Sequence, residues 1–276
     1  YNLKDAANTR ENQLLKNILD GETSLSNYIG NDPYDISPVR DDSPYFYKVK
    51  RGIPGDYFRL FIGVVLFTLI VILIPYSLIK KKIKRNDLKA LSVPLLIFIC
   101  IGAGFMIVEV SLFQKLILYL GSPTISLSIL LSSLLVGMGI GSFYGGKIYP
   151  GNNWKRLLIV GSLIVVIGIL FSILHPLILG RILKYNLFYR TGTSFLMILP
   201  FGFLLGIPFP TTLQILKNEN SSHLIPWMYG VNGAASVLGS VLAVILSMLY
   251  GFTYSFFIGL FFYTVIFIAA WLASKK

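Results

Sequence analysis

The sequence has 276 residues, of which 55% are hydrophobic and 13% are charged. Because soluble domains usually carry about 25% charged residues, this composition excludes an ordinary soluble protein and indicates a membrane protein. The formal net charge of +12 does not indicate a nucleic-acid-binding protein, because the basic residues lie in short loops between apolar runs and not on one face of a soluble fold.

Residues 1–56 are predicted to form a soluble segment. Nine of the 12 acidic residues lie at or before Asp56. Leu14, Leu15, Ile18 and Leu19 have the spacing of one face of a short helix, and residues 31–44 are rich in Asp, Pro and Ser, as in a loop. So few apolar residues cannot build a core, so we expect this segment to be the tail of a preceding domain.

The rest of the chain, residues 57–276, is predicted to form an all-α, polytopic bundle of transmembrane helices. The seven expected spans are 57–79, 91–120, 124–144, 154–179, 194–216, 227–250 and 253–272. A helix of about 30 residues is about 45 Å long, against a hydrocarbon core of about 30 Å. The second span must therefore tilt, break near Gly102 and Gly104, or leave the membrane near Gln114 and Lys115.

The distribution of basic residues predicts the orientation. The loops at 80–90, 147–156 and 217–225, together with the last two lysines, contain 12 basic residues, and the loops on the opposite side contain four. The positive-inside rule places the first set, and hence the C-terminus, in the cytoplasm and residues 1–56 on the other side. If a cytosolic domain precedes Tyr1, then either this orientation is wrong or the first apolar run does not cross.

Glu109 is the only acidic residue inside an apolar run. A carboxylate in lipid costs a few kcal/mol, so it normally faces protein or a water-filled cavity. Glu109 is therefore either a proton or cation site, or a residue near a helix end whose carboxylate is hydrogen-bonded or reaches the interface.

Other polar or helix-breaking positions lie in the second, fifth and sixth spans. Pro208 and Pro210 lack a backbone N–H and leave carbonyls free at membrane depth, as in transporter sites or in a structural kink. Asn232 is either an interhelical hydrogen-bond donor or a substrate ligand. The candidate substrate or ion residues are Glu109, Gln114, Pro208, Pro210 and Asn232.

Small residues predict where helices approach one another closely, because lipid does not drive helices together by the hydrophobic effect. We expect the second, fifth and sixth spans to pack together, and the first and seventh spans to face lipid. The positions expected to serve helix packing are Gly102, Gly104, Gly139, Gly141, Gly233 and Gly239.

No catalytic residue, metal site or cofactor is predicted. The single cysteine, Cys100, has no partner at metal-ligand spacing, and His175 and His223 are isolated at the ends of spans. The chain also lacks a strand followed by a Gly-rich turn and an acidic residue about 20 positions later, the pattern that binds a nucleoside cofactor.

Several separated motifs together resemble the membrane portion of the bacterial spermidine-synthase-like membrane proteins. Tyr229 and Thr211 depart from the family pattern, where a Trp and a Gly are expected. The motifs are residues 41–47, 102–109, 120–123, 139–142, 206–210 and 226–240, with Gln114. The resemblance implies a bacterial inner-membrane location and a parent protein with a soluble Rossmann-like domain related to aminopropyltransferases, which is absent from this chain.

Two functions follow as expectations. In the first, this chain anchors or regulates the soluble synthase-like domain of the same polypeptide, its other partner is the lipid bilayer, and it has no catalytic activity alone. In the second, it is a transporter-like module for a small cation or polyamine and uses the intramembrane carboxylate of Glu109. Neither function involves nucleic acid.

Overall fold

The computed structural model describes residues 41–44, 52–80, 85–219 and 221–275. The short helix expected around Leu14 and Leu19 lies outside these residues. The chain divides into two units, 1–54 and 55–276, and the helical bundle is the second unit. The described part of this unit contains seven segments that are long and apolar enough to cross a membrane, which confirms the predicted all-α membrane fold.

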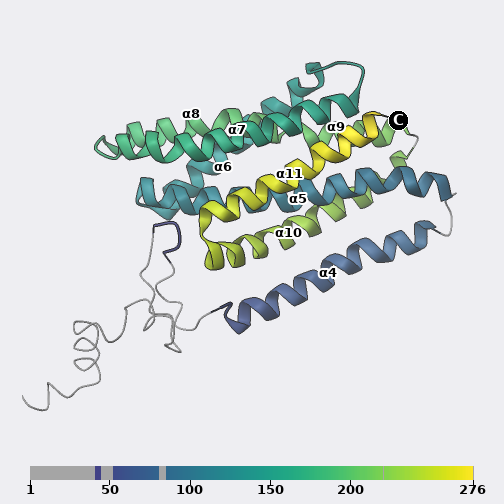
Figure 1. Ribbon diagram of the computed structural model, residues 1–276, viewed down its shortest axis with the longest axis horizontal. Helices are drawn as coiled ribbons and strands as arrows, with labels where there is room; N and C mark the ends of the chain where they lie inside the picture. The colour runs from purple at the N-terminus through teal and green to yellow at the C-terminus, as the bar shows by residue number, and fades with distance from the viewer. Residues whose placement is uncertain (1–40, 45–51, 81–84, 220, 276) are drawn as a thin grey trace, which may run out of the picture. The chain divides into compact units, whose positions relative to one another are not determined.

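The bundle is built from eight long helices in the described residues (Figure 1). Two of them, α8 and α9, together form the fifth span. Short 3₁₀ turns at Gly145–Lys147 and Ser222–Leu224 lie between spans. The long helices are α4 (Gly55–Lys80), α5 (Arg85–Leu120), α6 (Pro123–Tyr144), α7 (Asn153–Ile182), α8 (Leu187–Leu205), α9 (Pro208–Asn218), α10 (Ile225–Tyr250) and α11 (Phe252–Ser274).

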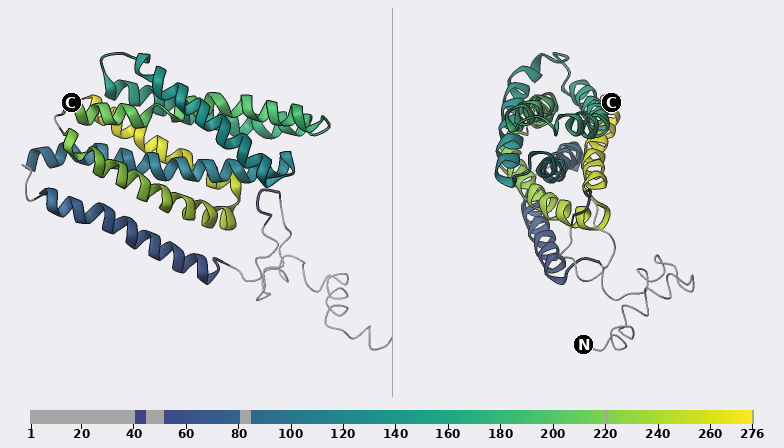
Figure 2. Two further views of the ribbon diagram at one scale, coloured as in Figure 1. Left: turned by 180° about the vertical axis from the view of Figure 1, so that it is seen from behind. Right: turned by 90° about the vertical axis from the view of Figure 1, so that its left-hand side faces the viewer.

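Helix α5 is the centre of the bundle. It is continuous through Gly102 and Gly104, so the long second span does not break there. Helices α10 and α11 make its most extensive contacts, and α6, α8 and α9 also touch it. Seen along the bundle in the right-hand view of Figure 2, the other helices surround α5, and α4 lies outermost against α10.

Glycine determines how closely α5 and α10 approach. A Cβ atom at Gly239 would lie 2.6 Å from the carbonyl oxygen of Ala103, and one at Gly102 would collide with the carbonyl oxygen of Asn232. The helices are parallel, since residue numbers on the two sides of the interface rise together. Only glycine permits backbones this close, so dispersion contacts and interhelical hydrogen bonds can hold the pair together.

Glycines also allow close backbone contact between α6 and α8. A Cβ atom at Gly137 would lie 2.6 Å from the carbonyl oxygen of Leu199, and one at Gly141 would collide with the carbonyl oxygen of Phe203. Gly206, directly after α8, lies equally close to the backbone of Met138. The third and fifth spans are therefore packed backbone to backbone.

The expectation that the seventh span faces lipid is wrong. Helix α11 packs between α5 and α7. A Cβ atom at Gly104 would lie 2.8 Å from Cβ of Phe262, and one at Gly259 would lie 2.7 Å from Cγ2 of Val108. The abundance of Phe, Ile and Leu in this span concealed its small residues, Gly259 and Ser255, which lie on the packed face.

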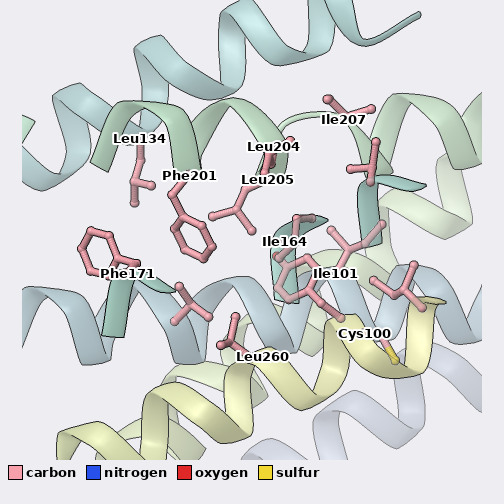
Figure 3. Close-up of a cluster of buried hydrophobic side chains, with 14 of the residues drawn as sticks. Cys100, Ile101, Leu134, Ile164, Phe171, Phe201, Leu204, Leu205, Ile207 and Leu260 are labelled. Carbon is pink, nitrogen blue, oxygen red and sulfur yellow. The ribbon is translucent and has the colours of Figure 1, made fainter. Parts of the chain in front are cut away.

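The hydrophobic core joins α5, α7, α8 and α11 (Figure 3). Phe171 of α7 stacks on Phe201 of α8 with ring centroids 6.0 Å apart, and it also contacts Phe256 of α11. Leu205 and Ile101 belong to the same cluster. This core fixes α8 against α5 just before the helix break, and therefore positions the break inside the bundle.

Candidate functional site

The site is built around the interruption between α8 and α9. Helix α8 ends at Leu205, and α9 begins at Pro208. Pro210 cannot donate a hydrogen bond to the carbonyl of Gly206, four residues earlier, because proline has no N–H. The break predicted from the two prolines is confirmed, and it leaves the Gly206 carbonyl without its usual helical donor.

Two hydroxyl groups stabilise the start of α9. The Thr211 hydroxyl donates to the carbonyl of Ile207 at 2.8 Å, and the Thr212 hydroxyl donates to the carbonyl of Pro208 at 2.8 Å. Both threonines are buried. The Ile207 carbonyl also accepts the backbone N–H of Thr211 at 3.2 Å, so the Thr211 hydroxyl adds to a helical bond that is already made. Of the two carbonyls that lose a donor to proline, that of Leu204 accepts instead from the N–H of Ile207 at 3.2 Å.

A cavity of about 440 Å³ lies beside the interruption. Helices α5, α6 and α10, the α8–α9 junction and one residue of α11 form its walls. Its apolar surface includes Phe105, Met138 and Phe209. The polar residues among its lining are Ser142, Asn232, Ser236 and Tyr263, and Gly206 and Pro210 bring the helix interruption to it.

Asn232 ties the cavity wall on α10 to α5. Its Nδ2 donates to the carbonyl of Phe98 at 3.0 Å, and the hydroxyl of Ser236 donates to the Asn232 backbone carbonyl at 2.9 Å. Gly102 makes this approach possible because it has no side chain. The side-chain amide is thus held at the cavity, where its oxygen can accept a hydrogen bond.

Tyr263 contributes the most unusual polar group. Its side chain is fully buried and lines the cavity, yet its hydroxyl has no hydrogen-bond partner within the described part of the chain. An unsatisfied buried hydroxyl costs about 1–3 kcal/mol. Because the side chain is fully buried, its hydroxyl is not accessible from the cavity.

The cavity opens sideways between α6 and α10. Leu135 on its α6 wall is 62% exposed, and a Cβ atom at Gly139 would meet nothing within 4 Å. Asn232 on the opposite wall is half-buried. All three residues lie within membrane spans, so the opening is at the depth of the lipid.

Arg156 fixes the connection between α6 and α7 next to this site. Its buried guanidinium donates to the carbonyls of Ile148 and Gly146, both at 2.8 Å, and to Oε1 of Gln214 on α9 at 3.0 Å. These acceptors are neutral, so the arginine acts through directed hydrogen bonds and not through an ion pair. The loop, α7 and α9 are held together by this one residue.

The structure separates the candidate residues into two groups. Pro210 and Asn232 line the cavity, and Pro208 is buried directly before Phe209, which also lines it. Glu109 and Gln114 are half-buried on α5 but do not line it. Glu109 lies seven residues beyond Gly102, which is about 10 Å along the helix axis.

Four of the six glycines that were expected to serve helix packing lie in close contact with another helix, and two do not. Close contacts with another helix occur at Gly102, Gly104, Gly141 and Gly239. Open space surrounds the Cβ positions of Gly139 and Gly233, so the structure shows no close helix contact at these two. Gly139 instead lines the cavity.

Tyr263 was missed in the sequence because it is one of several aromatic residues in an apolar span. Tyr263 lies four residues after Gly259 and therefore on the same helix face. A glycine on that face was the one sequence feature that could have indicated that Tyr263 is packed inside the bundle. Three or more His, Cys, Asp or Glu residues do not cluster as a metal site anywhere in the described ranges.

Fold and site together define a polytopic α-helical membrane protein with a laterally open cavity beside a broken helix. No family model, curated protein or solved structure matches the chain.

Proposed function

We propose that this chain is a membrane-embedded binding module and that its cavity holds a small molecule. The observation that carries the proposal is the cavity of about 440 Å³ beside the α8–α9 break, with a mainly apolar lining that includes the polar residues Ser142, Asn232 and Ser236. Ligand pockets are typically about 300–1,000 Å³ in volume, apolar in lining and supplied with a few polar groups. The cavity beside the α8–α9 break has this size and this composition.

Transport of a small cation or polyamine through Glu109 receives no support from the cavity. Glu109 does not line it, and the residues that do are uncharged. A cation would need a carboxylate or several convergent carbonyls to replace its hydration. Among the described lining residues there is no carboxylate, and Gly206 is the one whose carbonyl loses its helical donor to Pro210.

The sequence resemblance supports a second, compatible proposal. The chain would be the membrane module of a spermidine-synthase-like protein of the bacterial inner membrane, with a cytoplasmic C-terminus, and would anchor or regulate a soluble domain. Incubation of the purified chain with decarboxylated S-adenosylmethionine and putrescine should give no spermidine. Turnover above a protein-free control would contradict a purely anchoring or binding role.

Native mass spectrometry after mild detergent extraction tests the binding proposal. The chain should retain one bound small molecule, and Gly139→Trp should remove it. Gly139 lines the cavity, and its open Cβ position accepts a large side chain without a clash. The indole should cover the cavity wall because helical side chains lean toward the N-terminal turn.

Gly233→Trp is the matched control. Gly233 is also exposed and also has open space at Cβ, but it lies on α10 outside the cavity lining. This variant should keep the bound molecule. Equal retention by both variants, or no bound molecule in the unmodified chain, would show that the cavity is not a binding site.

A further inference from the structure

We propose that this chain binds an anionic phospholipid in a groove between α4 and α5. An acyl chain lies in the groove, and the phosphate lies at the basic stretch that connects the two helices. The groove shares no lining residue with the cavity beside the α8–α9 break, so this proposal does not rest on the binding function of that cavity. It rests on the packing of α4, the depth of the groove and the charge at its end.

The groove exists because α4 packs on α10 and not on α5. Helix α4 makes its main contacts with α10 and lies outermost in the bundle (Figure 2). A groove of about 300 Å³ remains between α4 and α5, and 54% of the Leu73 side chain on its α4 wall is exposed. Lipid therefore has access to it. The groove is lined by Ile72, Leu73, Tyr76, Leu91, Ser92 and Leu95.

The depth of the groove matches the upper part of an acyl chain. The apolar span of α4 ends at Ser77, and that of α5 begins at Leu91. The lining residue furthest from the end of the α4 span, Ile72, lies five residues before Ser77, or about 8 Å along the helix. The groove therefore begins at the membrane surface and stays within one leaflet of a hydrocarbon core about 30 Å thick. Four of its six lining residues are leucine or isoleucine, which suits an alkyl chain.

The charge at the surface end of the groove selects an anionic head group. Residues 80–90 contain six basic residues and one acidic residue. Lys80 is the last residue of α4, Arg85 is the first residue of α5, and Lys89 lies one turn later. Clusters of four to eight basic residues next to a span attract anionic lipids. A zwitterionic head group has no net charge and gains little from this attraction.

The same charge disfavours a second copy of this chain as the occupant. A copy inserted in the same orientation would bring its own basic stretch to this membrane surface. Like charges would then repel one another at the groove. A lipid with a phosphate head instead brings the opposite charge to the surface and an apolar chain to the groove, so it complements both parts.

Thermal unfolding in a neutral detergent tests the head group with two lipids that have the same acyl chains. Dioleoylphosphatidylglycerol should raise the unfolding midpoint in a saturable way, and dioleoylphosphatidylcholine should raise it much less. An increase in salt from 0.1 M to 1 M shortens the Debye length from about 10 Å to about 3 Å and should weaken the effect of phosphatidylglycerol. Equal effects of the two lipids would overturn the proposal.

Removal of three charges tests the position of the phosphate. Lys80→Gln, Arg85→Gln and Lys89→Gln together should lower the affinity for phosphatidylglycerol about 100-fold, because each basic residue near the surface contributes about fivefold. The matched control removes three exposed lysines from other connections of the bundle. If it lowers the affinity equally, the attraction is not localised at the groove and the proposal fails. The control substitutions are Lys147→Gln, Lys155→Gln and Lys217→Gln.

A matched pair of tryptophan variants tests the groove. Leu73 and Leu66 lie seven residues apart on α4 and are 54% and 56% exposed, but only Leu73 lines the groove. Both variants should fold like the unmodified chain. Leu73→Trp should lower the affinity for phosphatidylglycerol about tenfold, as expected when about two methylene groups are no longer buried. An equal loss in Leu66→Trp would show that the acyl chain does not lie in the groove.

Two further outcomes identify other occupants. A dimer that forms in the unmodified chain and is lost in Leu73→Trp would show that a second copy occupies the groove, and would overturn the proposal. Gly139→Trp, which lies in the lining of the other cavity, should keep its affinity for phosphatidylglycerol. If it loses that affinity, the lipid binds beside the α8–α9 break and the groove is not its site.

Discussion

Helices α4 and α5 have equal mean hydropathy over their most apolar windows, yet they occupy opposite environments. In α4 only 6% of that window is buried, against 61% in α5. The helices differ in where they carry small residues. Gly102 and Gly104 of α5 contact neighbouring helices closely, whereas Gly63 of α4 has nothing near its Cβ position. In lipid, burial is therefore governed by close backbone approach and not by hydropathy.

The largest effect is expected at the α5–α10 interface. Gly239→Leu should destabilise the fold by more than about 3 kcal/mol, because the new side chain would meet the backbone of Ala103, which cannot rotate away. The free energy of unfolding in mixed detergent micelles, followed by circular dichroism, measures this. Gly233→Leu on the same helix has open space and serves as the control, and equal losses would refute the role of close approach.

A smaller loss is expected between α5 and α11. Gly259→Leu should cost about 1–3 kcal/mol, because its closest neighbour, at 2.7 Å, is the end of the Val108 side chain, and the Val108 backbone nitrogen lies further away, at 3.1 Å. The same unfolding measurement applies. If Gly259→Leu is as stable as the unmodified chain, the seventh span is peripheral, as the sequence predicted.

The attachment of α4 should be weaker still. The indole N–H of Trp227 donates to the carbonyl of Val71 at 3.1 Å, and the hydroxyl of Thr68 donates to the carbonyl of Ala234 at 3.3 Å. Trp227→Phe should cost about 1 kcal/mol through the lost hydrogen bond. Faster proteolysis near α4, with the core of the bundle unchanged, is the expected readout, and a collapse of the whole bundle would show that α4 is structurally central.

The smallest effect is expected within α4 itself. Gly63→Leu should change the free energy of unfolding by less than about 0.5 kcal/mol, because the added side chain would extend into lipid without a clash. A loss comparable to that of Gly239→Leu would indicate that another protein surface covers this face.

Much of the fold could be predicted because membrane insertion is governed by local composition. The seven spans and the fifth-span break at Pro208 follow from apolar runs and from the missing N–H of proline. The peripheral place of α4 was also predicted correctly, and α11 was not, although both spans are rich in Phe, Ile and Leu. The difference lies in Gly259, one residue whose partner, Val108, is about 150 positions away in the sequence.

The candidate site was predicted only in part, for the same reason. Asn232 and Pro210 were found because a polar residue and a helix breaker are conspicuous in an apolar run. Glu109 was more conspicuous still, but it lies about two turns along α5 from the contact between Gly102 and Asn232, and it does not line the cavity. Tyr263 gave no such signal, because it is one of many aromatic residues in the apolar spans.

The sequence by itself determined that this chain crosses the membrane as helices and where one of them breaks. It did not fix every helix start, because the fifth span was predicted to begin at residue 194 and α8 begins at Leu187. The crossing and the break depend on the free energy of transferring each segment into lipid. That free energy is the sum of contributions from the residues within the segment itself. Only the tertiary structure decided that α5 and not α4 is central, and that Asn232, Pro210 and Tyr263 meet at one cavity. Those outcomes depend on which surfaces fit closely together, and shape complementarity between distant segments is not encoded in the composition of either one.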